Sequence, residues 1–336
     1  MNLSLIICTY MRPQAVCTLL DSVCEQTLQP NEILIVDGST DNYTELTIKE
    51  KRYNLPIHYH AVPPEHRGLT RQRNYGIAHV EKGCDLVAFL DDDVVLLPDY
   101  FKRIVEPFTD TEMVGVGGYI LDHENPNAWR QLNEGEKPNP DEYVYDGWAR
   151  KDASRMILRR RLGLAPDTPP CIMPEFSNGR SVGNLPPNGK VYHAEYFMGG
   201  VSVFRRSLFE KQRFSPYFEG YGLYEDLDFT LRASFIGKEC VHTGACLYHY
   251  HDPGGRPNQF KYGKMVIRNG WYVWRLKYPK PRIKARMKWY AIELLQTTIR
   301  YGNVFSTSDQ WGALSEAWGR TVGLFSVMFN PPKRID

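Results

Sequence analysis

Short apolar runs alternate with amphipathic stretches over the first 120 residues. The apolar runs predict four strands, at Leu3–Cys8, Glu32–Val36, Ile57–Val62 and Leu86–Leu90. Helices are predicted from Pro13 to about Gln26, because proline suits the first helical turn, and over Leu69–Val80. Continuous apolar runs are typical of strands that are buried on both faces. The alternation therefore predicts an α/β fold, with a mainly parallel sheet and helices on both of its faces.

The pattern changes between residues 122 and 193, where nine of the 23 prolines lie and the periodicity is poor. This range is predicted to be an insertion of long loops, with one short helix near Ala153–Leu162. The later elements are predicted as a strand at Tyr196–Arg205, a helix from Glu225 to about Ile236, and short strands at Glu239–His242 and Cys246–Tyr250. The Gly199-Gly200 pair falls inside the first of these strands.

The C-terminal part is predicted to be helical and basic. Eleven Lys and Arg residues and no acidic residue lie between Pro253 and Ile292, although the net charge of the whole chain is only +2. Apolar residues then recur every three or four positions, as on one helix face, at Trp311, Leu314, Trp318, Val322, Phe325 and Phe329. We expect one α/β domain over residues 1–252 and a basic helical extension over residues 253–336.

The composition excludes several classes of protein. Hydrophobic residues make up 42% of the chain and charged residues 24%, which is typical of globular proteins and not of collagen or disordered chains. No run of 18 apolar residues occurs, so no helix is expected to span a membrane by itself, and the first residues do not resemble a secretory signal. Seven scattered cysteines without a C-x-x-C pair favour a reducing compartment over a disulfide framework.

Three acidic residues directly follow a predicted strand. Asp91, Asp92 and Asp93 come after the apolar run, and Thr9 and Asp37 follow two other strands. Ligands bind beyond the carboxyl ends of parallel strands, so these polar residues indicate a binding site. Adjacent carboxylates repel one another, and Asp91 and Asp93 would face the same way, toward one hard divalent cation. The alternative is a solvated acidic turn that caps the following helix.

Two later segments carry further candidate groups. His249 and His251 share one face of the last predicted strand, and one of them could give a nitrogen ligand to the same cation or serve a structural role. Glu225, Asp226 and Asp228 open a predicted helix. Carboxylates at a helix start often serve only to cap the helix. One of these three could instead act as a general base that takes a proton from a hydroxyl nucleophile.

Two basic segments each allow two interpretations. Arg67, Arg71 and Arg73 lie at the start of a predicted helix, which suits phosphate binding or a solvated basic face. The basic range 253–292 is either a solvated helix pair on the core or a surface held against anionic lipid. Aromatic residues among its cations, such as Trp271 and Trp274, favour the lipid interface slightly.

Taken in order, these segments resemble the inverting glycosyltransferases of family 2, which have the GT-A fold, and among them the bacterial polysaccharide and rhamnosyl transferases. The matching segments are Ile6–Arg12, Ile35–Asp41, Gly68–Ile77, Phe89–Asp93, Gly199-Gly200, Tyr224–Ala233 and Leu247–His249. Residues Lys264–Lys277 also look like the helix that follows the catalytic core in bacterial members. Two features depart from the family: Gln72 stands where alanine is frequent, and the range 122–193 is longer than usual.

The resemblance implies a role for each matching residue. The nucleotide-binding residues would be Thr9, Tyr10, Arg12, Asp37, Arg71, Arg73, Asp91 and Asp92. The metal ligands would be Asp91, Asp93 and His249, with Mg²⁺ or Mn²⁺ as the cofactor. Asp226 would be the catalytic base, and Gly199, Gly200 and Glu225 would lie against the donor or acceptor sugar.

The implied reaction moves a sugar from a nucleotide-sugar donor, UDP-hexose or dTDP-rhamnose, to a hydroxyl group of a glycan or lipid-linked glycan. Asp226 would deprotonate this hydroxyl, which displaces the nucleoside diphosphate in a single step and inverts the anomeric configuration. A cytoplasmic location, peripheral on the inner face of the membrane, fits such an acceptor and the basic C-terminal range. The partners expected are therefore the donor, the acceptor and an anionic membrane surface.

Three other functions were weighed against this one. A sugar-1-phosphate nucleotidyltransferase has a similar sheet but usually a Gly-rich loop after its first strand, and Thr9–Pro13 contains no glycine. A non-catalytic nucleotide-sugar binding protein would not need Asp226 in addition to the metal ligands. Nucleic-acid binding is not expected, because the chain outside the basic range is acidic and shows no recognised nucleic-acid module.

Overall fold

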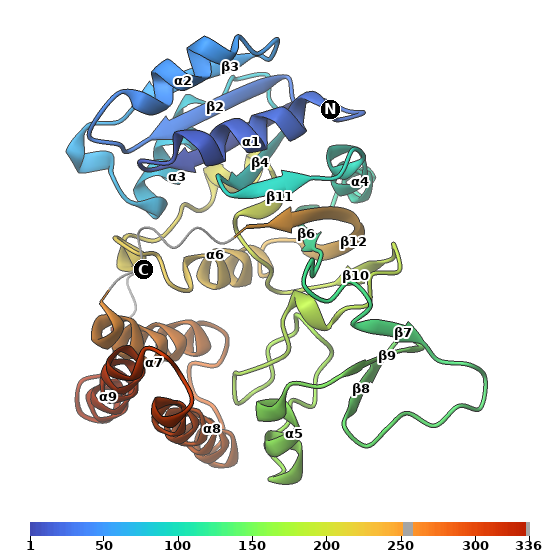
Figure 1. The fold of residues 1–336 in the computed structure, drawn as a ribbon, viewed down its shortest axis with the longest axis vertical. Helices are drawn as coiled ribbons and strands as arrows, with labels where there is room; N and C mark the ends of the chain where they lie inside the picture. The colour runs from blue at the N-terminus through green and yellow to red at the C-terminus, as the bar shows by residue number, and fades with distance from the viewer. Residues whose placement is uncertain (251–257, 334–336) are drawn as a thin grey trace. The chain divides into compact units, whose positions relative to one another are not determined.

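The computed structural model describes residues 1–250 and 258–333 of the 336-residue chain (Figure 1). The chain divides into two compact units. The first comprises Met1–Trp129 and Ser181–Pro253, and the second comprises Arg130–Arg180 and Gly254–Asp336. Part of the range 122–193 therefore belongs with the C-terminal helices, while the domain boundary expected after residue 252 stays a prediction.

The first unit is built on a nine-stranded sheet. Its strands lie in the order β10-β12-β6-β11-β4-β1-β2-β3, and β5 pairs with β12. The bounds are β1 Leu3–Thr9, β2 Glu32–Asp37, β3 Ile57–Ala61, β4 Leu86–Asp91, β5 Val94–Leu96, β6 Met113–Ile120, β10 Val191–His193, β11 Val201–Arg205 and β12 Lys238–His249. All four strands predicted in the first 120 residues are confirmed.

Six strands of this sheet run in the same direction. Strands β3, β2, β1 and β4 are parallel neighbours, and β6 and β12 are parallel to each other. Strand β11 lies between β4 and β6 and is antiparallel to both, so β6 and β12 run the same way as β4. The carboxyl ends of six strands and the start of β11 therefore share one edge of the sheet. The predicted mixed, mainly parallel sheet is confirmed.

Helices cover both faces of the sheet, as predicted. They are α1 Pro13–Cys24, α2 Tyr43–Lys51, α3 Leu69–His79, α4 Tyr100–Val105 and α6 Glu225–Ala233. Leu5 of β1 belongs to the same buried cluster as Leu19 of α1. Ile6 points to the opposite face, where a Cβ atom on Gly76 of α3 would lie only 2.8 Å from its side chain. Burial on both faces explains the continuous apolar run of β1, since each fully buried Leu or Ile contributes roughly 1.5–3 kcal/mol.

Two predicted strands are corrected by the structure. Strand β11 begins only at Val201, and Gly199 and Gly200 lie in the turn before it, so the strand predicted from Tyr196 is wrong in its first half. The strands predicted at Glu239–His242 and Cys246–Tyr250 form one strand, β12. This strand remains paired with β6 on both sides of a register shift between Val241 and Cys246, the gap that separates the two predicted strands.

The second unit combines helices with a small sheet. Its elements are α5 Ser154–Arg161, α7 Gln259–Lys277, α8 Ile283–Gly302, α9 Gln310–Phe329 and the strands β7 Trp129–Gln131, β8 Glu142–Tyr145 and β9 Trp148–Lys151, in the order β7-β9-β8. The short helix and the helical C-terminal part are confirmed. Trp274 stacks on Trp289 with ring centroids 5.3 Å apart, and its indole N–H donates to the Glu175 carbonyl at 2.8 Å. The inserted segment thus packs on the helices of its own unit.

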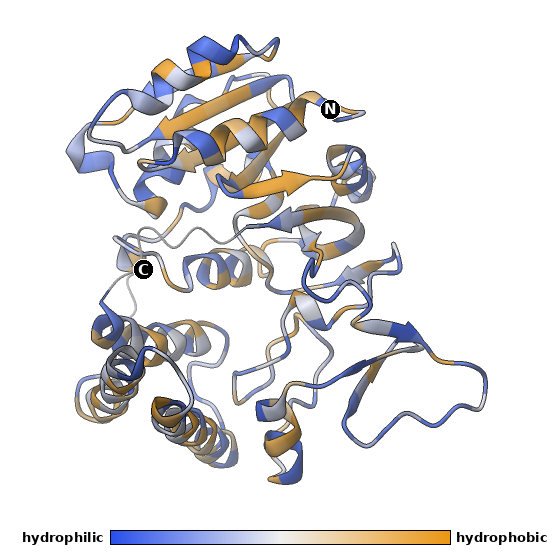
Figure 2. Ribbon diagram, viewed as in Figure 1, coloured by the Kyte–Doolittle hydropathy of each residue, from blue (hydrophilic) through white to orange (hydrophobic). Residues whose placement is uncertain are grey.

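Apolar residues follow the strands of the sheet, and they also mark the helices of the second unit (Figure 2). Helix α9 exposes much of its apolar stripe: Trp311 and Phe329 are both 82% exposed, and Trp318 is 56% exposed. In residues 1–250 and 258–333, no helix has the length and apolar character needed to cross a bilayer.

Candidate active site

Three potential metal ligands meet at the carboxyl edge of the first unit's sheet. Asp91 ends β4, Asp93 lies in the turn that follows, and His249 ends β12. One ligand atom from each lies within 4.8 Å of the others, and His249 Nε2 is 2.9 Å from Asp93 Oδ1. Burial by itself lowers the pKa of His249, but its hydrogen bond with Asp93 and the charges of Asp91 and Asp92 outweigh burial and raise it. The three side chains are half-buried, so a ligand can reach them.

Asp92 faces away from this cluster and is held inside the protein. Thr9 Oγ1 donates a 2.7 Å hydrogen bond to one carboxylate oxygen of Asp92, and Arg12 forms a 3.0 Å ion pair with the other. Burial raises the pKa of Asp92 to about 6, although Thr9 and Arg12 oppose this rise. Arg12 also lies 3.5 Å from Asp93. Arg12 and Thr9 thereby fix the acidic turn against the end of β1.

Asp37 at the end of β2 is buried and accepts hydrogen bonds at both oxygens. The Ser39 backbone N–H donates to Oδ1 at 2.7 Å, and the Tyr59 hydroxyl donates to Oδ2. Burial and this hydrogen bond raise the pKa of Tyr59, so it stays a neutral donor. Tyr59 was not among the predicted site residues, because its place in an alternating edge strand gives no signal of a role.

Gln72 of α3 ties the ends of two strands to the helix. Its amide nitrogen donates to the carbonyls of Thr9 at 2.9 Å and Val36 at 2.8 Å, and its oxygen accepts from the Gly68 N–H at 3.2 Å. Alanine, which the resemblance leads one to expect here, could make none of these bonds. The departure at this position therefore has a structural reason: Gln72 fixes the carboxyl ends of β1 and β2.

Arg73 links the metal-ligand cluster to the start of α6. Its side chain is buried, pairs with Glu225, and lies 3.4 Å from Asp91. Its guanidinium also lies over the rings of Phe214 and Phe89, at 5.2 and 5.8 Å from their centroids. Burial alone would lower the pKa of Arg73, but the charges of Glu225 and Asp91 more than compensate and raise it. Arg73 therefore remains a cation beside the carboxylates.

Asp226 stands next to this ion pair, in the first turn of α6. Burial raises its pKa, while the backbone N–H of Leu227, which donates to Oδ1 at 2.8 Å, and the charge of Arg73 oppose the rise. Burial also raises the pKa of Glu225, to about 8. One oxygen of Glu225 is buried and has no hydrogen-bond partner in the described part of the chain. Raised carboxylate pKa values of this kind are frequent at sites of proton transfer.

Gly199 and Gly200 pass so close to these carboxylates that only glycine fits. A Cβ atom on Gly200 would lie 2.0 Å from the Asp91 carboxylate, and one on Gly199 would lie 2.6 Å from Arg73. The Asp91 N–H also donates to the Gly200 carbonyl at 2.9 Å. The turn before β11 therefore borders the site with backbone atoms only, because its two glycines have no side chains.

The remaining candidates are placed differently. Tyr10 is 52% exposed beside the edge of the sheet. Arg71 pairs with Glu219 and donates to the Glu65 carbonyl at 3.1 Å, and not to the buried carboxylates of the site. Asp228 is buried and pairs with Arg232 at 2.6 Å, which leaves Asp226 as the better-placed base of the two. His251 lies outside the described residues.

Comparisons with known proteins identify the family of this chain. The family model described as glycosyl transferase family 2 matches residues 4–174, about half of the chain. The uncharacterized glycosyltransferase YwdF of Bacillus subtilis is 28% identical over 130 residues, which cover 39% of this chain and 47% of that protein. The O-antigen chain rhamnosyltransferase RfbN of Salmonella typhimurium is 29% identical over 129 residues, or 38% and 40% of the two chains. The match thus spans less than half the length of these relatives.

Solved structures support the fold. A mannosyltransferase from Pyrobaculum calidifontis, solved in complex with GDP-Man and Mn²⁺, aligns over 97% of this chain and 87% of its own, with a TM-score of 0.54 and 13% identity. Residues 1–349 of S. aureus TarS align with a TM-score of 0.50 over 100% and 94% of the two chains, also at 13% identity. The first unit carries the GT-A fold, and the chain belongs to glycosyltransferase family 2.

Proposed function

We propose that this protein is an inverting, metal-dependent glycosyltransferase that transfers a sugar from a nucleotide-sugar donor to a hydroxyl group of a glycan or lipid-linked glycan. The observation that carries the proposal is the meeting of Asp91, Asp93 and His249 at the sheet edge that also holds Asp226. Arg73 connects the metal-ligand cluster with the start of α6, since it contacts both Asp91 and Glu225, the residue before Asp226. A metal-ligand set and a base with a raised pKa at one edge suit displacement of a diphosphate by a hydroxyl group.

The donor is proposed to be UDP-hexose or dTDP-rhamnose. The relative RfbN is named as a rhamnosyltransferase of the O-antigen chain, and ExoM of Rhizobium meliloti, 23% identical over 166 residues, is named for succinoglycan biosynthesis. Both names support a polysaccharide as the acceptor. The mannosyltransferase from Pyrobaculum calidifontis was solved with GDP-Man, so GDP-sugars belong among the donors to be tested.

The ligand set fits a divalent cation. Two carboxylates and one imidazole would supply three ligands to such a cation. The carboxylates suit Mg²⁺ and Mn²⁺, and the imidazole favours Mn²⁺ of the two. Such a cation, when bound, would neutralise negative charge on the diphosphate as it leaves. Asp91, Asp93 and His249 would hold it, while Arg12 pairs with Asp92 and also lies 3.5 Å from Asp93.

The chain's own residues then supply the acid–base step. The carboxylate of Asp226 takes the proton from the acceptor hydroxyl, whose oxygen forms the new bond to the anomeric carbon. The bond from this carbon to the donor phosphate breaks on the opposite side, and the nucleoside diphosphate leaves with the electron pair. Gly199 and Gly200 leave room for the side chains of Arg73 and Asp91, which border the base. The anomeric configuration is inverted, and no covalent sugar–protein intermediate forms.

The test is a donor screen that measures released nucleoside diphosphate. UDP-, dTDP- and GDP-sugars are incubated with the protein and Mn²⁺ or Mg²⁺, with and without EDTA. We expect turnover of one donor class, loss of turnover with EDTA, and recovery when the cation is added back in excess. Full turnover in EDTA would contradict metal dependence, and turnover of no nucleotide sugar under any condition would contradict the function itself.

We also propose that the second unit attaches the protein to the cytoplasmic face of an anionic membrane. Two features of this unit support the proposal. Helix α9 exposes aromatic side chains along one stripe, as Trp311, Trp318 and Phe329 show. Exposed cations precede it, among them Lys280 and Lys284. Apolar side chains together with nearby cations are what binds a helix to an anionic bilayer surface.

A further inference from the structure

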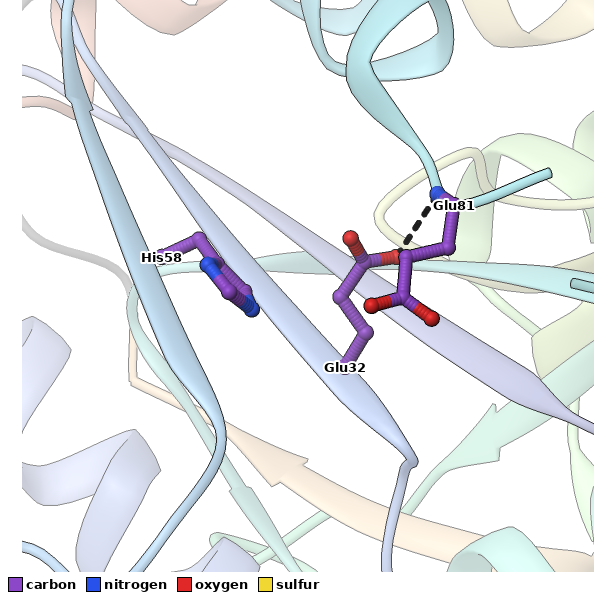
Figure 3. A group of neighbouring side chains, drawn as sticks. All are labelled: Glu32, His58 and Glu81. Carbon is purple, nitrogen blue, oxygen red and sulfur yellow. Dashed lines mark hydrogen bonds between the residues drawn. The ribbon is translucent and has the colours of Figure 1, made fainter. Parts of the chain in front are cut away.

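A second group of metal-ligand side chains lies far from the candidate active site. Glu32 is the first residue of β2, His58 is the second residue of β3, and Glu81 follows the end of α3. One ligand atom from each lies within 4.8 Å of the others. Glu32 lies between the other two side chains (Figure 3). None of the three residues has a part in the proposed transfer reaction.

The group lies at the amino-terminal edge of the sheet, opposite the candidate active site. Glu32 and Asp37 are the first and last residues of β2. At about 3.3 Å per residue, the two ends of this strand are roughly 16 Å apart. Glu81 comes after α3, which starts near Gly68 at the active-site edge and runs back antiparallel to the strands. The two ligand groups are therefore separate sites.

Glu32 is fixed in place as a ligand would be. It is 4% exposed, and one of its carboxylate oxygens accepts a 2.6 Å hydrogen bond from the Ser4 hydroxyl and a 3.2 Å bond from the Glu81 N–H. In the described part of the chain, no Lys or Arg forms an ion pair with Glu32 or Glu81. Two carboxylates thus share a small space with an imidazole and no cationic side chain, although like charges in such a space repel each other.

Two further histidines, His60 and His79, lie on β3 and at the end of α3. His60 is two residues after His58 and therefore on the same face of β3. Its ring centroid is 5.2 Å from that of His79, the last residue of α3. His60 and His79 thus add two imidazoles on the side of β3 that carries His58, but the three-ligand group itself consists of Glu32, His58 and Glu81. Imidazole with carboxylate suits Zn²⁺ and related transition metals better than Mg²⁺ or Ca²⁺, which prefer oxygen ligands alone.

We propose that Glu32, His58 and Glu81 bind one divalent transition-metal ion of the Zn²⁺ class, through one nitrogen and two oxygen atoms. The ion joins the start of β2, the start of β3 and the end of α3. The opposite end of β2 carries Asp37, and the first turn of α3 carries Gln72. The ion would therefore stabilise two elements that position residues of the candidate active site. Its role is structural, and its binding stabilises the fold without chemistry at the ion.

The experiment measures Zn²⁺ binding in a background that lacks the first ligand group. In the variant Asp93→Asn with His249→Asn, competition with a chromophoric chelator should reveal one tight Zn²⁺ site, and Zn²⁺ should raise the melting temperature. Adding His58→Asn or Glu81→Gln, both exposed positions, should weaken binding at least about 10-fold, because even indirect partners of a ligand are worth that much. Adding His193→Asn or Glu50→Gln, also exposed, should change neither measurement.

Two results would overturn the proposal. One is Zn²⁺ affinity in the His58→Asn and Glu81→Gln variants equal to that of the controls, with circular dichroism showing all variants folded. The other is an intense near-ultraviolet thiolate-to-metal band with Co²⁺, which would place the ion on cysteines such as the exposed Cys24. Because both measurements follow binding and not turnover, they are independent of whether the donor screen succeeds.

Discussion

Asp226 is the side chain whose removal should separate sugar transfer from donor binding. Asparagine has nearly the same size and still accepts the Leu227 N–H, so the start of α6 should keep its structure. We expect Asp226→Asn to bind the donor normally but to transfer the sugar roughly 10²–10⁴-fold more slowly, the usual contribution of a positioned general base. The measurements are donor affinity by calorimetry and transfer rate at saturating donor. Transfer at the parent rate would move the base to Glu225 or Asp228.

The charge of Arg73 should set the acid limit of the reaction. Asp226 must be deprotonated to act as the base, so the rate should rise with pH through its raised pKa. Arg73 lowers that pKa, so Arg73→Gln should raise it further and move the acid limb of the pH–rate profile to higher pH. Arg73→Lys keeps the charge and should leave the limb close to its original place. The profiles are measured at saturating Mn²⁺, so that protonation of His249 does not limit the rate.

The same profiles can refute this assignment. If Arg73→Gln remains folded by near-ultraviolet circular dichroism and its acid limb does not move, the charge of Arg73 does not act on the base. In that case the ion pair of Arg73 with Glu225 serves only to hold α6 against the sheet.

Gly200 should be needed for the metal-ligand group and not for the fold as a whole. A methyl group at this position would meet the Asp91 carboxylate at 2.0 Å, so Gly200→Ala should displace Asp91 and weaken Mn²⁺ binding at least about 10-fold. Gly83→Ala is the matched control, because a Cβ there meets nothing within 4 Å. Mn²⁺ affinity is read by electron paramagnetic resonance. Equal affinity in the two variants would show that Asp91 is not a ligand.

At the level of secondary-structure elements, α8, the residues just before it and α9 carry the proposed membrane contact. We expect the protein to sediment with anionic liposomes at low salt, less with neutral ones, and less again as salt is added, because salt screens the attraction. Replacing Lys280, Lys284 and Lys288 by Gln should reduce sedimentation and leave donor turnover intact. Replacing the exposed Lys82, Lys102 and Lys211 by Gln changes the charge equally and serves as the control.

The exposed aromatic residues of α9 allow a second, independent test of membrane binding. Trp318 and Phe329 are exposed, so replacing both by Ser should weaken liposome binding without loss of folded protein. Binding to neither kind of vesicle, or equal binding to both, would contradict the membrane proposal. The basic residues would then be a solvated surface, and the aromatic stripe of α9 would pack against something other than a membrane.

Elements that are buried on both faces were the most predictable. Strands β1 and β4 are predictable from their apolar runs, which contain Ser4 as the one polar residue before the polar ends Thr9 and Asp91. Helix α2 was missed because only Thr44 and Ile48 are buried in it, too few to form an apolar stripe. β12 was predicted as two strands, Glu239–His242 and Cys246–Tyr250, whereas pairing with β6 on both sides of a register shift joins them into one strand.

The candidate site was predictable where the residues of one short segment act together. The acidic turn after β4 and the start of α6 stand out as local motifs. The burial of Arg73 does not, because it depends on Glu225, which lies 152 positions away along the chain. The bonds of Gln72 to the ends of β1 and β2 likewise arise only when the sheet has formed. The pattern of a single sequence therefore indicates candidate residues within one segment, but not the distant residues with which they form hydrogen bonds and ion pairs in the folded protein.

The molecule as a whole places its last candidate ligand at the end of its last sheet strand. His249 and Asp93 meet in space but are 156 residues apart in sequence. During synthesis, the ribosome releases the two aspartates long before β12 can pair with β5 and β6. A nascent chain that stops short of residue 249 therefore presents two carboxylates without their imidazole. The loop closed between Asp93 and His249 is also long, so its ends meet late in folding. If the proposed metal dependence holds, tight cation binding would report that the sheet is complete, and a truncated translation product would lack one of the three ligands and should bind the cation more weakly.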